Sequence, residues 1–351
     1  MDTEVNPEQP ITGPSVPKRP ALRLLGREPQ LSRLTTLFPV ALSGRAASAM
    51  VIGAWRFGKT ALLREVTARA REAGFAVATA AGARLERHLN GGVANQLISA
   101  LTQPLVDDPA SPLPHPRLSE ARPRGVAEES EALESFYRVV RTAAEQGPVY
   151  LGVDNIHLAD SWSMHCIAYI QHRVVDLPVL MVFTTLLGAP PHEEVDLREM
   201  AGCTPMTVKL TGLGETETAQ LLDLAPGELA SACCEATGGN PHLLGSLRQR
   251  LLPGTDPRSI GSASVGQIMH ARMQDVPGAS AILNAAAILG EDADFDTLTQ
   301  LAGVDEFVAL EAVDAMARLH LLTNSHTPEI SIPFIRNSIL TDMPLTTRAV
   351  S

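Results

Sequence analysis

The chain reads Ala49-Met50-Val51-Ile52-Gly53-Ala54-Trp55-Arg56-Phe57-Gly58-Lys59-Thr60, an apolar run followed by a glycine-containing turn. The turn matches the pattern Gly-x-x-x-x-Gly-Lys-Thr in full, and a stretch of helix-forming residues follows it directly. A strand, this turn and a helix in succession are the context in which the pattern binds phosphate. Because the chain contains only three lysines, a chance match is rare, and we interpret the turn as a phosphate-binding loop.

Each residue type in this loop has a physical task. Glycines let several backbone amide groups converge on phosphate oxygens, and the following helix directs its positive end to the same place. Lys59 is expected to reach the β and γ phosphates of ATP or ADP, and the Thr60 hydroxyl is expected to ligate Mg²⁺. We therefore expect nucleotide contacts from Gly53, Phe57, Gly58, Lys59, Thr60 and Ala61.

The strand before the loop is one of five short apolar segments, at residues 49–52, 75–78, 149–153, 179–183 and 206–210. Helical stretches fit between them at residues 60–73, 92–102 and 161–175. Such alternation predicts an α/β fold, a P-loop NTPase with a parallel five-stranded sheet covered by helices on both faces. The stretch 107–124, rich in Pro and Ser, is expected to be a long exposed loop.

A second acidic group is needed to hold Mg²⁺, and Asp154 supplies it at the end of the third apolar segment. The next residue is Asn155, whose amide can hydrogen-bond a water molecule but cannot accept its proton, so slow or absent hydrolysis is expected. Lys59, Asp154 and Asn155 are the candidate catalytic residues. Asp160 is expected to cap the next helix, and His157 is expected to be structural. An active ATPase, in which His157 or Asp160 compensates for Asn155, remains the alternative.

After residue 213 the strand signal ends and helical periodicity takes over. Helices are expected at residues 215–222, 227–236 and 241–251, a linker at 256–264, and further helices at 265–273, 279–289, 295–302 and 308–318. A hairpin of residues 321–323 and 329–332 is expected to close this unit. The expected organisation is a proline-rich disordered leader (1–21), a nucleotide-binding domain (22–212), a small helical domain (213–255) and a winged-helix-like domain (262–345).

Composition excludes several other classes of protein. The net charge of −11, without a basic block, argues against a surface that binds duplex nucleic acid. Neither a secretion signal nor an apolar run of the roughly 18 residues needed to span a bilayer is found, so we expect a cytoplasmic protein without membrane contact. The four cysteines, Cys166, Cys203, Cys233 and Cys234, show no metal-ligand or disulfide spacing and are expected to be free thiols, and metal other than Mg²⁺ is not indicated.

Four ordered motifs carry a resemblance to a known family: Leu25-Gly26-Arg27-Glu28, the loop, the segment Val153-Asp154-Asn155-Ile156-His157-Leu158-Ala159-Asp160-Ser161, and Ala236-Thr237-Gly238-Gly239-Asn240-Pro241-His242-Leu243-Leu244. Together they resemble the ATPase region of the large LuxR-type bacterial transcriptional regulators, which belong to the STAND class of P-loop ATPases. This resemblance implies a switch in which ADP is held between three domains and exchange for ATP opens the molecule for self-assembly. It also implies that Arg27 lies near the adenine or ribose and Pro241 near the base or phosphates. Equally, residues 238–241 would serve as a helix stop followed by a helix start.

The chain departs from the family pattern at three places. Asn155 stands where the family usually has a second acidic residue, Thr184-Thr185-Leu186-Leu187 stands where it usually has an arginine, and Ile332 replaces a histidine in Ile330-Ser331-Ile332-Pro333-Phe334-Ile335-Arg336. We expect no helix-turn-helix domain after Arg348, so DNA recognition is not carried over from the family. We expect an ATP/ADP-binding regulatory module that acts through protein contacts or self-association in transcriptional regulation. A protein-interaction scaffold with a vestigial nucleotide site is a further alternative.

Overall fold

The computed structural model describes residues 24–106, 125–189, 206–290, 294–323 and 328–344. Its centre is a five-stranded parallel sheet in the order β2-β3-β4-β1-β5. The strands are β1 (Ala47–Gly53), β2 (Ala76–Ala81), β3 (Val149–Asp154), β4 (Val179–Leu186) and β5 (Met206–Leu210). The last residue of β1 pairs with the last residues of β4 and β5, so the carboxyl ends of these strands align at one edge. The predicted α/β fold with a parallel five-stranded sheet is confirmed.

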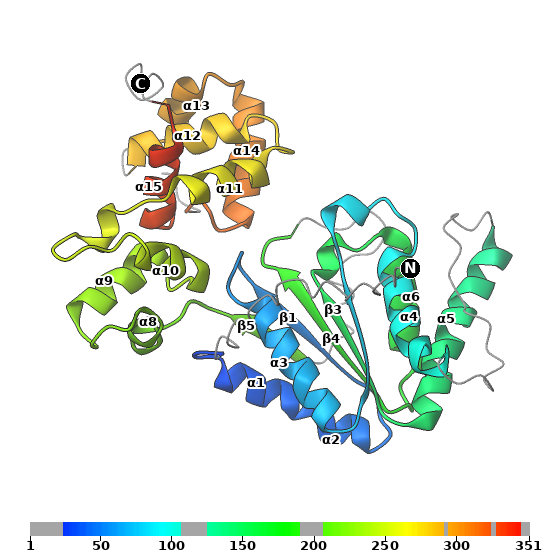
Figure 1. Cartoon of the computed structure of the whole chain (residues 1–351). Coiled ribbons are helices and arrows are strands. Elements are labelled where there is room, and N and C mark those ends of the chain that lie inside the picture. Colours follow the sequence, from blue (N-terminus) through cyan, green and yellow to red (C-terminus); the bar gives the residue numbers. More distant parts are fainter. Residues whose placement is uncertain (1–23, 107–124, 190–205, 291–293, 324–327, 345–351) are drawn as a thin grey trace, which may run out of the picture.

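Helices cover both faces of this sheet (Figure 1). One face carries α1 (Glu28–Thr35), α2 (Leu37–Leu42) and α3 (Lys59–Glu72), and the other carries α4 (Gly92–Val106), α5 (Val126–Gln146) and α6 (Ser161–Arg173). Successive strand side chains point to opposite faces. Accordingly Ala49 and Val51 enter the apolar cluster beneath α1–α3, whereas Met50 enters the cluster beneath α4–α6. Burial on both faces explains why β1, β3 and β4 are almost continuously apolar.

The predicted helices at 60–73, 92–102 and 161–175 correspond to α3, α4 and α6. Three others were not predicted: α1, α2 and α5. The described residues of this part also form the short 3-10 turns η1 (Arg84–Glu86) and η2 (Ile156–Leu158). The expected leader 1–21 and the expected loop 107–124 lie outside the described residues.

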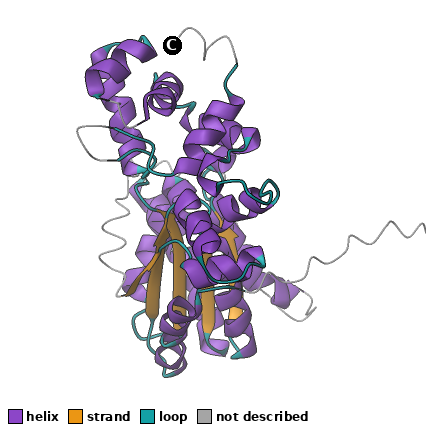
Figure 2. Ribbon diagram, turned by 90° about the vertical axis from the view of Figure 1, so that its left-hand side faces the viewer, coloured by secondary structure: helices purple, strands orange, loops and turns teal. Residues whose placement is uncertain are grey.

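After β5 the chain is helical, and Figure 2 shows this part stacked at one end of the strands. A first group comprises α8 (Glu215–Leu222), α9 (Glu228–Thr237) and α10 (Pro241–Arg248), and the turn η3 (Pro257–Ser259) leads out of it. A second group comprises α11 (Ala263–Met273), α12 (Ala279–Leu289), α13 (Phe295–Ala302), α14 (Glu306–Arg318) and α15 (Pro333–Asp342). These bounds agree with the helices predicted from residue 215 onward, apart from α15.

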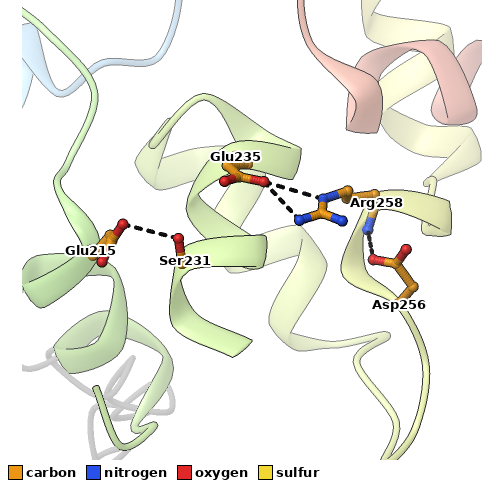
Figure 3. Close-up of polar contacts among 5 residues, drawn as sticks. All are labelled: Glu215, Ser231, Glu235, Asp256 and Arg258. Atoms are coloured by element: carbon orange, nitrogen blue, oxygen red, sulfur yellow. Dashed lines mark hydrogen bonds and ion pairs between the residues drawn. The ribbon is translucent and has the colours of Figure 1, made fainter. Parts of the chain in front are cut away.

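One apolar cluster runs through both helical groups, because Leu243 and Leu244 of α10 belong to the same core as Ile282 of α12 and Phe334 of α15. Polar contacts support the first group (Figure 3). The Ser231 hydroxyl of α9 donates to Glu215 of α8 over 2.9 Å. Where η3 meets α9, the Arg258 guanidinium forms an ion pair with Glu235 over 2.8 Å. The predicted boundary between a small helical domain and a winged-helix-like domain stays a prediction.

The predicted closing hairpin is present only as a short pairing. Leu322 and Ile330 form an antiparallel bridge, the Thr323 amide donates to the Glu329 carbonyl over 2.8 Å, and the Ser331 amide donates to the Leu321 carbonyl over 2.9 Å. The hairpin does not close the unit, however, because α15 follows and packs against α11 and α12. Proline at the first position of α15 favours this helix start, since proline lacks only an amide hydrogen that would have no helical partner there.

Two further expectations concern thiols and membranes. Among the described cysteines, Cys166 and Cys233 are buried free thiols and Cys234 is a partly buried one, whereas Cys203 lies outside the described residues. In the part of the chain that the structure describes, no helix is long and apolar enough to cross a bilayer.

Candidate nucleotide site

The loop between β1 and α3 has the backbone that its glycines predict. Gly58 directly precedes α3 and has a φ of 89°, in the left-handed region that side chains disfavour. A Cβ atom at Gly58 would meet nothing within 4 Å, so the glycine is required by this dihedral angle and not by lack of space. Arg56 also has a positive φ, of 61°. The loop therefore turns back over the amino-terminal end of α3, where free helix amides favour an anion.

Lys59 lies inside this loop. Its side chain is 8% exposed, and its Nζ donates hydrogen bonds to the carbonyls of Gly53 and Ala54 over 2.8 and 2.9 Å. Burial lowers the pKa of Lys59 to about 8, although the Asp154 carboxylate opposes the shift. The ammonium group is thus held at the centre of the loop by carbonyls, at the place where the sequence predicts phosphate.

Thr60 and Asp154 form the predicted Mg²⁺ pair. The Thr60 hydroxyl on α3 donates to Asp154 Oδ2 at the end of β3 over 2.7 Å, although the two residues are far apart in sequence. A hydroxyl and a carboxylate, completed by phosphate oxygens and water, are the oxygen ligands that Mg²⁺ prefers. A pocket of about 440 Å³ opens beside the pair, between α3 and β2. The residues present therefore fit a nucleotide-bound magnesium ion.

Thr184 holds the other oxygen of this carboxylate. Its hydroxyl, on β4, donates to Asp154 Oδ1 and also accepts the Asn155 amide hydrogen over 2.8 Å. Thr184 is buried, so its hydroxyl holds the Asp154 carboxylate in one orientation. From the sequence, this position is notable only for the lack of the family's arginine. The signal that could have identified it is a hydroxyl residue near the carboxyl end of a strand adjacent to β3.

The groups that could activate a water molecule are restrained. Asn155 has a left-handed backbone, with a φ of 51°. His157 Nδ1 accepts the Leu186 amide hydrogen over 3.3 Å, and burial, with Lys59 nearby, lowers the pKa of His157 to about 4. The imidazole is therefore neutral at pH 7, and one of its nitrogens is engaged with the backbone.

Asp160 has the capping role that the sequence predicts. Its carboxylate accepts the Ser163 amide over 2.8 Å at the start of α6 and the Gly91 amide over 2.7 Å before α4. The Ser163 hydroxyl donates to it as well, over 2.6 Å. With 3% exposure, this carboxylate is a structural tie between two helices.

Arg27 lies beneath the loop. Its Nη2 donates to the Phe57 carbonyl over 3.1 Å and to the Thr211 carbonyl after β5 over 2.7 Å. Burial lowers the pKa of this guanidinium, and Glu217 opposes the shift. Arg27 thus ties the loop to the connection between β5 and α8, and its expected contact with adenine or ribose stays a prediction. Ala61, also predicted to contact nucleotide, is exposed on the first turn of α3.

The first helical group reaches the loop through the Gly-Gly-Asn-Pro segment. Asn240 Nδ2 donates to the Trp55 carbonyl over 3.0 Å, and its Oδ1 accepts the His242 amide over 3.0 Å at the start of α10. The Trp55 and His242 rings meet edge to face at 5.2 Å. Gly238 ends α9 in the left-handed conformation, and Pro241 opens α10, so the segment is a helix stop and a helix start. Whether Pro241 also contacts nucleotide stays a prediction.

A parallel sheet in this order, with a Gly-x-x-x-x-Gly-Lys-Thr loop after β1 and a carboxylate at the end of β3, defines a P-loop nucleotide-binding fold. Residues 23–182 match the family model of the AAA ATPase domain, which makes this part of the chain an AAA-type nucleotide-binding ATPase domain. No curated protein matches the chain.

Several solved structures are similar to the chain. The ORC2 protein of Aeropyrum pernix, in ADPNP-ADP complexes, has a TM-score of 0.54 and 12% identity over 94% of this chain and 95% of that chain. Cdc6p of Pyrobaculum aerophilum has a TM-score of 0.44 and 14% identity over 91% of this chain and 93% of that one. A STAND protein with a tetratricopeptide repeat sensor from Pyrococcus horikoshii has a TM-score of 0.40 and 12% identity over 92% of this chain and 43% of that one. At 12% identity the likeness to the ORC2 protein concerns the fold alone.

Proposed function

We propose that this protein is a regulatory switch that binds ATP or ADP with Mg²⁺ and passes the state of its nucleotide site to a protein partner through its helical groups. The observation that carries the proposal is the set of contacts at one loop. Lys59 is buried within it, Thr60 and Asp154 meet beside it over 2.7 Å, and Asn240 of the helical part is bonded to its Trp55 carbonyl. Phosphate binding and contact with the helical groups therefore involve the same few residues.

The chain's own residues would divide the work of binding. The loop amides and the amino-terminal end of α3 would accept the phosphates, and Lys59 would exchange its two carbonyl partners for phosphate oxygens. Thr60 and Asp154 would hold Mg²⁺, which neutralises phosphate charge when bound. The ADPNP-ADP complexes named for the ORC2 protein of the same fold support adenine as the base.

We further propose that hydrolysis is weak or absent. A general base must be able to accept a proton near the operating pH. Asn155 cannot, His157 has a pKa of about 4 and binds the backbone, and the oxygens of Asp160 are occupied at two helix starts. These contacts speak against His157 or Asp160 compensating for Asn155, as an active ATPase would require.

The proposed setting is transcriptional regulation, as in the LuxR-type regulators that the sequence motifs resemble. The helical groups contact the loop and would therefore relay the state of the nucleotide site. They would do so through contacts with another protein or with a second copy of this chain. A scaffold with a vestigial nucleotide site is the competing function, and it predicts no nucleotide affinity at all.

Calorimetry of the full chain with MgATP and MgADP tests the proposal. We expect both to bind the unmodified protein, and Lys59→Ala to weaken binding by at least about 10-fold, because a charge-assisted hydrogen bond to phosphate is lost. Lys209→Ala is the matched control, since Lys209 is an exposed lysine on β5 and its loss should leave affinity unchanged. Absence of binding by the unmodified protein would favour the scaffold, and rapid ADP release from MgATP would favour an active ATPase.

A further inference from the structure

Arg272 brings a cation from the second helical group to the phosphate loop. It is the penultimate residue of α11, and its guanidinium carbon lies 5.5 Å from the centroid of the Trp55 ring. Its Nε is buried and finds no hydrogen-bond partner among the described residues. A buried charged donor without a partner is costly, so its placement needs a physical reason.

The surroundings of Arg272 are positive. Burial, together with the neighbouring cations Arg56 and Arg84, lowers its pKa to about 10. Arg272 in turn lowers the pKa of Lys59 and of His157. Four cations thus lie close together beside the loop. They are Arg56 of the loop, Arg84 of η1, Lys59 of α3 and Arg272 of α11. Of the acidic groups there, Asp154 faces Lys59, and Asp275 pairs with Arg84.

Such a cluster is complementary to a small ligand with several negative charges. Guanidinium groups bind phosphate oxygens through paired hydrogen bonds. A phosphorylated ligand at this loop would provide oxygens that accept a hydrogen bond from the Arg272 Nε–H. We propose that Arg272 binds the phosphate chain of the nucleotide held by the loop, so that the second helical group completes the site. This inference rests on the proposed function.

A nucleotide bound by both the loop and Arg272 would bias the arrangement of the chain. A ligand that contacts both the loop and α11 stabilises the form in which the two are in contact. The size of this stabilisation equals the difference in the ligand's binding free energy between that form and the separated one. The competing explanation is purely structural: Arg272 would stack on Trp55 as a cation–π contact, which contributes to stability with or without nucleotide.

Two variants of the full chain separate these explanations. Arg272→Gln removes the charge and keeps a polar side chain, and Arg272→Lys keeps the charge without the planar pair of donors. Arg258→Gln is the matched control, because Arg258 belongs to the helical part and its guanidinium is bonded to Glu235 over 2.8 Å (Figure 3). Calorimetry measures the affinity for MgATP and MgADP, and thermal unfolding without nucleotide measures the stability of the ligand-free protein.

We expect Arg272→Gln to weaken MgATP binding by about 10- to 100-fold, Arg272→Lys to weaken it less, and Arg258→Gln to leave it unchanged. Without nucleotide, the melting temperature of Arg272→Gln should equal or exceed that of the unmodified protein, because a buried unpaired charge has been removed.

Equal affinity in Arg272→Gln and Arg258→Gln would overturn the inference and leave the proposed function intact. A lowered melting temperature without nucleotide, together with unchanged affinity, would instead assign Arg272 to a structural contact. If the unmodified protein binds neither nucleotide, the proposed function fails first, and the inference fails with it.

Discussion

Asn240 serves two neighbours at once, and a pair of replacements can separate its roles. Its Oδ1 caps α10 by accepting the amides of His242 and Leu243 over 3.0 and 3.4 Å, while its Nδ2 donates to the Trp55 carbonyl of the loop over 3.0 Å. The side chain is 2% exposed. Asn240→Ala removes both roles. Asn240→Ser keeps a good helix cap but is too short to reach the loop.

The magnitudes follow from the two contacts. Loss of a helix cap costs about 1 kcal/mol, and loss of one neutral buried hydrogen bond costs about another 1 kcal/mol. We therefore expect the free energy of unfolding to fall by about 2 kcal/mol in Asn240→Ala and by about 1 kcal/mol in Asn240→Ser.

Urea unfolding at 25 °C, followed by circular dichroism, measures both differences against the unmodified protein. Equal losses in the two variants would refute the assignment of a separate contribution to the bond with the loop. No loss in either would refute the capping role as well.

Three further predictions concern other contacts. Thr184→Val should weaken MgATP binding by about 5-fold in calorimetry, because Asp154 loses the hydroxyl that orients it; an unchanged affinity would contradict this role. Asp160→Ala should lower the free energy of unfolding by about 3 kcal/mol or more in urea titrations, since two buried amides lose their acceptor, and a loss below about 1 kcal/mol would contradict the double tie. Gly239→Ala should lower the melting temperature, because its φ is +63° and a methyl group there would strike the main chain before α8. Gly245→Ala, where a Cβ atom meets nothing within 4 Å, is the control and should be neutral or slightly stabilising.

The sheet and its loop were predictable because several local signals coincide there. Strands buried on both faces must be apolar throughout, and β1 leads directly into a glycine pattern with a narrow chemical purpose. Asp154 was likewise found because it ends such a strand. The helix end and helix start in the Gly-Gly-Asn-Pro segment were also predictable, since helix stop and start signals are local.

Other features were missed because their signals are weak or non-local. Helix α5 buries only Phe136, Val140 and Ala144, a narrow stripe on a polar helix. Thr184 meets Asp154 only because β3 and β4 are paired in the sheet. Arg272 lies far from Trp55 along the chain, and its contact with the loop depends on how the helical groups pack. None of these contacts is encoded in a short stretch of residues.

Trp55 stands where the loop, α10 and α11 meet, touched by Asn240, His242 and the Arg272 guanidinium. The chain has one other tryptophan, Trp162, which is 4% exposed and enclosed in the apolar core beneath the sheet. Indole fluorescence responds to nearby charges and to water. Separation of the helices from the loop would therefore change the emission of Trp55 and leave that of Trp162 constant. Trp55 fluorescence would therefore report a change in these contacts without any added dye.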